Sequence, residues 1–296
     1  MVRSVVVALL ALLALPTSVP AWGFDAHRFI TERALALLPP ELRPFFEHRR
    51  AFVVERSVDP DLWRSAGFDR EPPNHFVDLD YEQFGPDPFA GLPRDFDAAV
   101  QKFGPELVAE QGTLPWRAQE FYGRLQRSFE ALERNPPSAY ALDDIAFFAA
   151  VLAHYIEDAH VPLHAVVNYD GQLTKQRGLH ARWETDLFER VREHFTMAPR
   201  APQPMINPRD TLFDTLLASN RLVPGLLEAD RRAAAGREHY DEEYFAAFAA
   251  SQGPVLERRV NDAATAVASA IVGAWHQAGR PAVPVTKRVE PKKIGQ

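Results

Sequence analysis

The sequence predicts an all-α protein in which one large domain is built from several long helices. Apolar residues recur at three- to four-residue spacing through most of the chain, which is the period of one helical face. The alternating pattern of a half-buried strand is almost absent. Proline clusters at 72–73, 86–93 and 199–208 mark irregular connections between the helical segments.

Six segments carry this helical stripe, and they are expected to form the body of the domain. They are residues 27–38, 116–134, 143–160, 180–195, 210–234 and 255–278. Between the first two segments lies a long insertion, residues 57–95, that reads as structured. No internal repeat is found, so the sequence predicts one domain.

The first residues have the pattern of a secretory signal peptide. Arg3 precedes an apolar run from Val5 to Leu15, and small residues come before position 22. A membrane anchor is the alternative, but the run is short of the roughly 20 residues needed to span a bilayer. We expect residues 1–21 to be removed, leaving a secreted or periplasmic domain at 22–280 without a transmembrane anchor. The proline- and lysine-rich residues 281–296 are expected to be a disordered tail.

The composition restricts the chemistry that the protein can perform. The chain has no cysteine, which excludes disulfides, thiolate metal sites and thiol nucleophiles. A metal must therefore be held by histidine, aspartate, glutamate or backbone atoms. The formal net charge of −7 argues against a broad basic surface for a long nucleic-acid duplex, although a local metal site could still bind one phosphate.

Titratable residues gather at the end of the apolar segment 143–160. His154 and Asp158 stand four apart, so they share one helical face. Burying such groups is costly unless they are paired, and a bound cation would compensate them. A kink at Pro162 would bring His164 towards a neighbouring metal. His160 is a rival ligand, and spacing alone does not separate the two.

A second group of candidate ligands lies elsewhere in the chain. In "HARWE", His180 and Glu184 stand four apart, and His27 lies near the predicted new N-terminus. The insertion contributes Asp61 in "SVDPD" and His75 in "NHFVD". Imidazoles and carboxylates without thiols are typical of catalytic zinc.

Taken in order, "WGFDAH", "SVDPD", "HFVD", "HYIEDAHVPLH" and "HARWE" resemble the superfamily that joins zinc-dependent phospholipases C with single-strand-specific zinc nucleases. The resemblance runs from Trp22 to about Glu184 and continues more loosely through the C-terminal helices. It implies a single multi-helical domain with three zinc ions clustered in a cleft.

The resemblance also implies which residues hold each ion. The implied ligands are Asp61, His75, His154 and Asp158 for the first ion, His164, His180 and Glu184 for the second, and His27, a bridging Asp158 and the free amine and carbonyl of Trp22 for the third. It leaves His160 and Glu157 beside the ligands or at the surface. Asp59 is set aside because the spacing S-x-x-P-D aligns Asp61.

Asp61 is then the carboxylate expected to orient or deprotonate the attacking water. Arg64 follows it by three residues, which suits either a phosphate site or a surface ion pair. Both are predicted as catalytic residues.

Two groups of features point to different substrates. Glu184 as the last ligand and the absence of cysteine resemble the phospholipases, whereas "WGFDAH" and "DLWR" resemble the nucleases. Phe76 and Asp78 match positions at which nucleases stack and hydrogen-bond a base, although Phe76 also suits a core.

The leading prediction is a phosphodiester hydrolase of the phospholipase C type that acts on a phospholipid head group. The alternatives are an endonuclease that releases 5′-nucleotides from single-stranded nucleic acid, and a non-catalytic zinc-binding protein. No stable protein partner is implied.

Overall fold

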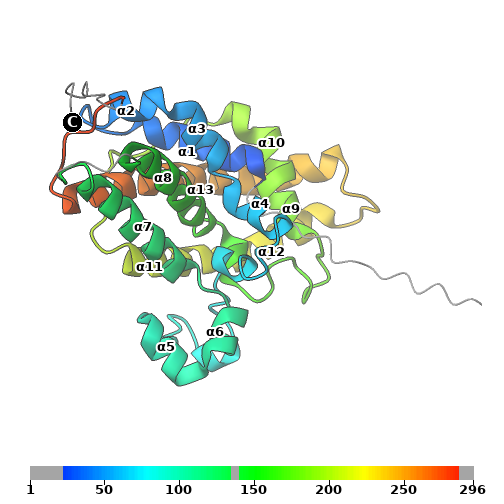
Figure 1. The fold of residues 1–296 in the computed structure, drawn as a ribbon. Helices are drawn as coiled ribbons and strands as arrows, with labels where there is room; N and C mark the ends of the chain where they lie inside the picture. The colour runs from blue at the N-terminus through cyan, green and yellow to red at the C-terminus, as the bar shows by residue number, and fades with distance from the viewer. Residues whose placement is uncertain (1–22, 135–139, 287–296) are drawn as a thin grey trace, which may run out of the picture.

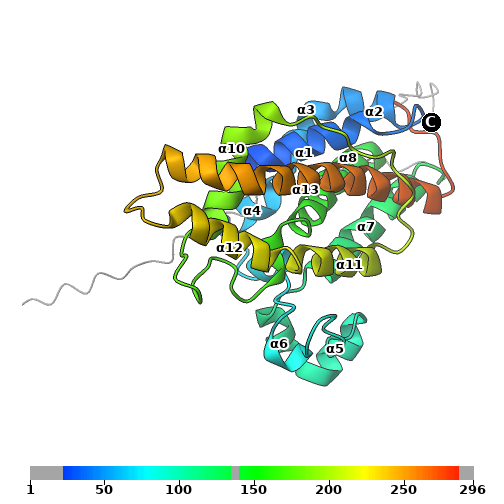
Figure 2. The ribbon, with the colours of Figure 1, turned by 180° about the vertical axis from the view of Figure 1, so that it is seen from behind.

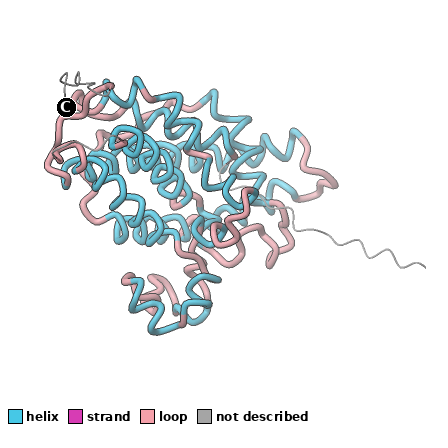
Figure 3. The backbone as a smooth tube through the Cα atoms, in the orientation of Figure 1, coloured by secondary structure: helices cyan, strands magenta, loops and turns pink. Residues whose placement is uncertain are grey.

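The computed structural model describes residues 23–134 and 140–286, apart from the side chain of Arg64. This part of the chain contains helices and loops but no strand (Figure 3), as the helical periodicity predicts. The helices are α1 (Phe24–Ala36), α2 (Arg43–His48), α3 (Arg50–Arg56), α4 (Asp59–Ser65), η1 (Pro72–His75), η2 (Glu82–Phe84), α5 (Phe96–Phe103), α6 (Pro105–Glu110), α7 (Leu114–Glu130), α8 (Ala141–Asp158), η3 (Pro162–Ala165), α9 (Leu179–Ala181), η4 (Arg182–Leu187), α10 (Phe188–Val191), η5 (Arg192–His194), α11 (Pro208–Asn220), α12 (Val223–Ala234) and α13 (Glu242–Gln277).

Helix α8 forms the centre of the bundle. It packs against α7, α13, α3 and α1, and most of its side chains are buried (Figures 1 and 2). A helix that is apolar around its whole circumference must be covered on every side. The apolar run before His154 therefore fixes the last turn of α8 inside the bundle.

Helix α13 is the longest helix and lies along α8, α1 and α7 (Figure 2). It begins at Glu242, earlier than the start predicted at residue 255, because Asp241 caps its first turn by accepting a hydrogen bond from Tyr244 N. Pro254 lies inside the helix and removes only one backbone donor, so the helix continues through it.

Two predicted helices are divided in the structure. Residues 210–234 form α11 and α12, because Pro224 at the start of α12 cannot continue the preceding helix. Residues 180–195 form a succession of short helical turns, one of which, η4, is a π-helix. The helices α2, α3, α5 and α6 were not predicted as separate elements.

Helices α5 and α6 lie away from the main bundle in both ribbon views (Figures 1 and 2). They follow the predicted insertion, and Asp95 begins α5 by accepting a hydrogen bond from Ala98 N. The chain returns from α6 to α7 next to η1, where it contacts the segment that carries His75.

The two ends of the predicted domain are only partly within the described residues. The predicted signal peptide and Trp22 lie outside them, as do residues 287–296 of the predicted tail. Within the described residues of that tail, Pro281 accepts a hydrogen bond from the Trp275 indole, and Val283 packs on the core. None of the described helices has the length and apolar character that crossing a bilayer requires.

Candidate metal centre

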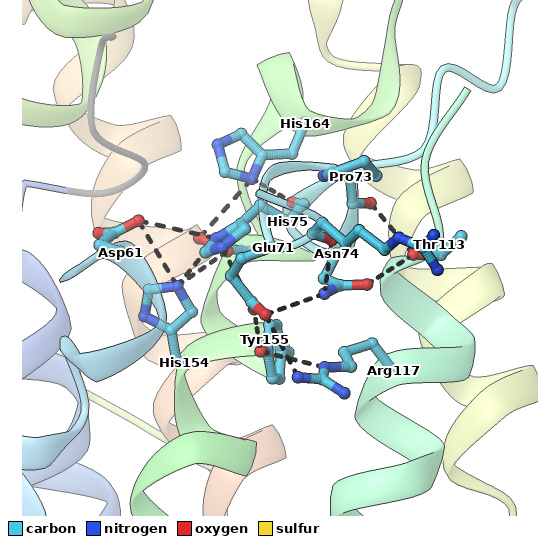
Figure 4. Close-up of polar contacts among 12 residues, drawn as sticks. Asp61, Glu71, Pro73, Asn74, His75, Thr113, Arg117, His154, Tyr155 and His164 are labelled. Atoms are coloured by element: carbon cyan, nitrogen blue, oxygen red, sulfur yellow. Dashed lines mark hydrogen bonds and ion pairs between the residues drawn. The ribbon is translucent and has the colours of Figure 1, made fainter. Parts of the chain in front are cut away.

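The predicted ligands that the structure describes come together around the last turn of α8. They come from seven elements, namely His27 from α1, Asp61 from α4, His75 from η1, His154 and Asp158 from α8, His164 from η3, His180 from α9, and Glu184 from η4. Three combinations of these residues each bring their ligand atoms within 4.8 Å of one another. Figure 4 shows Asp61, His75, His154 and His164 facing a common centre.

The first group is built around His75 and His154. The Nδ1 atom of His75 lies 2.9 Å from Asp158 Oδ2 and 3.0 Å from His154 Nε2. Asp61 Oδ1 completes the group, at 3.7 Å from His75 Nδ1 and 3.8 Å from His154 Nε2. Four donor atoms from three separate parts of the chain therefore converge.

The second group consists of His164, His180 and Glu184. Glu184 Oε1 lies 2.6 Å from His180 Nε2 and 3.3 Å from His164 Nε2, and the two imidazole nitrogens are 3.1 Å apart. The π-helical turn η4 carries Glu184, and π-helical turns are frequent at functional sites. Arg182 holds this turn by donating to Asp230, which also accepts a hydrogen bond from Tyr244.

His27 approaches the cluster from another side, beside Asp158. Its Nε2 lies 3.6 Å from Asp158 Oδ1, whereas the other oxygen of Asp158 faces His75 and His154. The two oxygens of Asp158 thus face different groups, which is the arrangement of a carboxylate that bridges two cations. A cavity of about 250 Å³ lies at the start of α1, the helix that carries His27, and Glu184 is one of the residues that line it.

The chain orients these imidazoles through their other nitrogens. His154 Nδ1 lies 2.8 Å from Ser57 O, and His164 Nδ1 lies 2.7 Å from His75 O. Because a carbonyl oxygen only accepts, both Nδ1 atoms must carry the proton, which leaves each Nε2 lone pair free for the cluster.

Buried donor atoms without a hydrogen-bond partner test whether a cation fits here. They include His27 Nε2, Asp61 Oδ2, Asp158 Oδ1 and both carboxylate oxygens of Glu184. Some of these oxygens lie near imidazole nitrogens, but burying so many carboxylate oxygens that accept no hydrogen bond is costly without a compensating cation. Imidazole nitrogens and carboxylate oxygens are zinc ligands, so the residues fit the predicted metal.

The acid–base properties of the cluster reflect its density of carboxylates. Burial alone would lower the pKa of His154, but Asp158 and Asp61 raise it to about 9. For His164, burial likewise opposes the charged form, and Asp158 and Glu184 raise its pKa to about 9. Burial opposes the ionised form of Asp158, yet the charges of His154 and His164 hold its pKa well below the usual range. The site therefore stabilises positive charge.

Two residues that were set aside lie outside the cluster. His160 contacts Ile156 O through Nδ1 at 2.7 Å, and burial followed by the charge of Arg259 lowers its pKa to about 3. Asp59 accepts a hydrogen bond from Arg56 at 2.9 Å. The helix that carries His154 ends at Asp158, so His164 is placed by the separate turn η3 and not by the kinked helix that Pro162 suggested.

The remaining predicted residues have the following places. Phe76 and Asp78 are half-buried and follow His75 directly. Burial and then the neighbouring Asp80 raise the pKa of Asp78 to about 7. Arg64 belongs to α4, but its side chain lies outside the described part of the chain, and so does Trp22.

Two buried glutamates lie beside the cluster: Glu157, for which a place beside the ligands was one of two alternatives, and Glu71, which was not predicted. Glu157 is completely buried, where its carboxylate contacts His27 Nδ1 at 2.5 Å and accepts from Thr31 at 2.7 Å, so the surface position considered for it is wrong. Glu71 is buried behind His75. Glu71 precedes His75 by four residues, and this spacing could have indicated that the two side chains lie near each other.

A comparison with protein families agrees with this geometry. Residues 26–225 match the family described as zinc-dependent phospholipase C, and this range contains all eight described ligand candidates. No protein among the curated sequences matches the chain. Since the match covers more than half of the chain and includes the whole cluster, the protein belongs to the zinc-dependent phospholipase C family.

Proposed function

We propose that the protein hydrolyses phospholipids in the manner of a phospholipase C, using three zinc ions held at the candidate metal centre. The observation that carries this proposal is the set of buried carboxylate oxygens and imidazole nitrogens that lack hydrogen-bond partners and lie within one cluster. Membership of the family supports zinc as the metal and a phosphate ester as the substrate.

The proposed ligands follow the three groups of donor atoms. Asp61, His75, His154 and Asp158 would hold the first ion, and His164, His180 and Glu184 the second. His27 and the second oxygen of Asp158 would hold the third, together with the amine and carbonyl of Trp22. When bound, zinc supplies Lewis acidity that polarises the phosphoryl oxygens and makes water more acidic.

Residues of the chain supply the remaining steps. Asp61 accepts the proton of the attacking water, since its Oδ2 is buried and has no other hydrogen-bond partner. The water oxygen forms a bond to phosphorus, and the bond from phosphorus to the glycerol oxygen breaks. The glycerol oxygen takes up the proton that Asp61 accepted, so Asp61 is restored and the products are diacylglycerol and a phosphorylated head group. Arg64, three residues after Asp61, is assigned to bind a non-bridging phosphate oxygen.

A nuclease is the second candidate, and one observation favours it. Phe76 is only half-buried and adjoins His75, so a base could stack on its exposed part. The net charge of −7 counts against tight binding of a long polyanion. A non-catalytic zinc protein is the third possibility.

One parallel assay separates these candidates. The zinc-loaded protein, starting at Trp22, is incubated with phosphatidylcholine in mixed micelles and, separately, with single-stranded DNA. We expect release of phosphocholine and diacylglycerol. Release of 5′-nucleotides alone would identify a nuclease, and no turnover of either substrate at full zinc content would favour a binding protein.

Export of the protein remains part of the proposal. Cleavage after Ala21 would free the amine of Trp22, and an amide nitrogen in the uncut chain has no lone pair to offer a metal. We therefore infer a secreted or periplasmic enzyme that completes its metal centre after processing.

A further inference from the structure

Glu71 is a buried carboxylate that accepts hydrogen bonds from three sides. Tyr155 donates its hydroxyl to Oε1, while Arg117 Nη2 and Asn74 Nδ2 donate to Oε2 at 3.2 and 3.1 Å (Figure 4). The side chain of Glu71 is only 4% exposed, so these donors replace the water that an ionised carboxylate needs. Three donors, one of them a guanidinium, thus surround this carboxylate.

His75 lies between Glu71 and the metal centre. Its Nδ1 faces Asp158 at 2.9 Å, and its Nε2 is 3.7 Å from Glu71 Oε1. His154 and His164 have the opposite arrangement, since each presents Nε2 to the cluster and ties Nδ1 to a backbone oxygen. His75 has no such backbone bond to select its tautomer.

We propose that Glu71 is a positioning residue that fixes His75 with its proton on Nε2 and its lone pair on Nδ1, toward the metal. The inference rests on the proposed role of His75 as a zinc ligand. The separation of 3.7 Å is too long for a hydrogen bond, so Glu71 acts through its charge. With a cation held between His75 Nδ1 and Asp158, as proposed, the charge of Glu71 beside Nε2 favours the tautomer that turns N–H toward Glu71.

The surroundings of Glu71 hold its charge in place. Arg117 extends from α7, Tyr155 from α8, and Thr113 fixes Asn74 by donating to its side-chain oxygen at 2.8 Å. Arg117 also pairs with Glu120, through Nη1 at 2.8 Å. Arg117 thus pairs with two carboxylates, Glu71 and Glu120. Of these two, Glu71 is the one that lies next to His75, a predicted ligand.

This difference provides a matched pair of variants. Glu71→Gln and Glu120→Gln each remove one negative partner of Arg117, but only the first removes the charge behind His75. The zinc affinity of each full-length mature protein is measured by competition with a chromophoric zinc chelator. We expect Glu71→Gln to weaken the affinity of at least one ion about 10- to 100-fold, as is usual for a group that orients a ligand. Glu120→Gln should match the wild type.

A spectroscopic measurement separates positioning from support of the fold. In the zinc-loaded wild type labelled with ¹⁵N-histidine, His75 should show a protonated Nε2 and a metal-bound Nδ1, with its signals assigned by their loss in His75→Gln. In Glu71→Gln this pattern should weaken or change, while the signals of His154 and His164 persist. Equal zinc affinity and an unchanged His75 pattern in Glu71→Gln would overturn the inference.

Two further variants keep the test decisive. His75→Ala should lose zinc, and retention of full zinc by His75→Ala would reject the proposed metal centre itself, not only the role of Glu71. If Glu71→Gln does not fold, Glu71→Asp keeps the charge but draws the carboxylate back from His75 by one methylene group. A several-fold loss of zinc affinity is then expected, and wild-type affinity in folded Glu71→Asp would count against the inference.

Discussion

At the scale of single residues, several histidines of the candidate centre are oriented by contacts of the ring nitrogen that faces away from the cluster. His154 and His164 each give one nitrogen to a backbone oxygen, and His27 gives one to Glu157. An imidazole fixed in this way does not have to be reoriented when a metal binds, so part of the entropic cost is met during folding. The remaining nitrogen of each ring faces carboxylates.

The choice between two neighbouring histidines gives the first prediction. His154→Ala should remove at least one zinc ion per chain, because it deletes a nitrogen within 3.8 Å of Asp61, Asp158 and His75. His160→Ala should remove none, since the ring of His160 contacts the backbone oxygen of Ile156 in the last turn of α8. Elemental analysis after purification without chelators measures both. Loss of zinc from His160→Ala alone would show that the wrong imidazole was chosen.

Asp61 and Asp59 provide an equally close comparison for catalysis. Asp61→Asn should lower turnover on the order of 10²-fold or more, because it removes the proposed base from the cluster. Asp59→Asn makes the same change two residues away, where the carboxylate pairs with Arg56, and should stay near the wild-type rate. Turnover and circular dichroism are measured on the same samples. A normal rate for Asp61→Asn at full zinc content would remove Asp61 from the mechanism.

At the scale of elements, the centre depends on short segments locked against long helices. The segment from η1 to Val77 is held by backbone hydrogen bonds to residues 111–114 and to His164. This arrangement requires Gly112, whose φ is +98° and whose added Cβ would lie 2.1 Å from Phe76 O. The position of His75 therefore depends on a close approach that only glycine permits.

Gly112→Ala should consequently destabilise the protein and disturb the metal centre. We expect a loss of about 1–3 kcal/mol in the free energy of unfolding from overpacking, in addition to backbone strain, together with reduced zinc content. Gly236→Ala is the control, because Gly236 also has a positive φ of 74° but has open space at its Cβ. Urea unfolding and elemental analysis compare them. Equal losses in both variants would show that strain alone, without the clash, accounts for the effect.

The turn after α8 makes stability depend on pH. His160 is buried there, and Arg259 donates to its backbone oxygen at 2.8 Å. Its pKa is about 3 in the folded protein and about 6.5 in the unfolded chain, so acid protonates the unfolded chain first. The stability due to a neutral His160 is therefore fully present above pH 6.5 and is lost progressively as the pH falls from 6.5 towards about 3.

The corresponding experiment compares the wild type with His160→Gln at two pH values. Between pH 7.5 and pH 5, the wild type should lose about 2 kcal/mol more unfolding free energy than the variant. Chemical denaturation at each pH gives the four values. Both proteins contain the same metal ligands, so the contribution of these ligands to the pH dependence cancels when the two proteins are compared. Identical pH dependence would mean that His160 takes up a proton in the folded protein.

The long elements of this fold could be predicted from the sequence, but their ends and the short elements could not. The apolar stripe of 143–160 predicted α8 within two residues at each end. In contrast, α5 and α6 are only eight and six residues long, which is too short for a periodic stripe to stand out. Pro254 and Pro224 cannot be told apart by their sequence. Pro254 lies inside α13, whereas Pro224 stands in the first turn of a new helix, α12.

Within the candidate site, the described residues that converge could be predicted from the sequence, whereas the contacts that support them could not. The resemblance selected His164 over His160, and the structure brings His164 to Glu184. Glu71 is connected by spacing only with His75, and Arg117 lies far in sequence from every predicted ligand. Their role depends on how α7, α8 and η1 pack, which local pattern does not specify.

At the scale of the whole molecule, the bundle is organised around a core that contains charge. The fully buried side chains include His27, His154, Asp158 and Glu184, alongside the large aromatic residues of the main core. The match to the family extends from α1 into α12, and the ligands lie on elements from α1 to η4. Packing of the domain and occupancy of the metal centre should therefore be thermodynamically linked.

Removal of zinc from the whole protein should consequently lower its stability. Without the cations, oxygens of Asp61, Asp158 and Glu184 that accept no hydrogen bond remain buried in the bundle, whereas unfolding exposes them to water. A single zinc ion at 100 times its dissociation constant adds about 2.7 kcal/mol to the free energy of unfolding. Chelation should thus lower the urea midpoint at pH 7.5, and added Zn²⁺ should restore it. Mg²⁺ should not, because it prefers oxygen ligands and this centre is rich in imidazole nitrogen. A urea midpoint that does not change after elemental analysis has verified the loss of zinc would show that the folded bundle tolerates these buried charges without a metal.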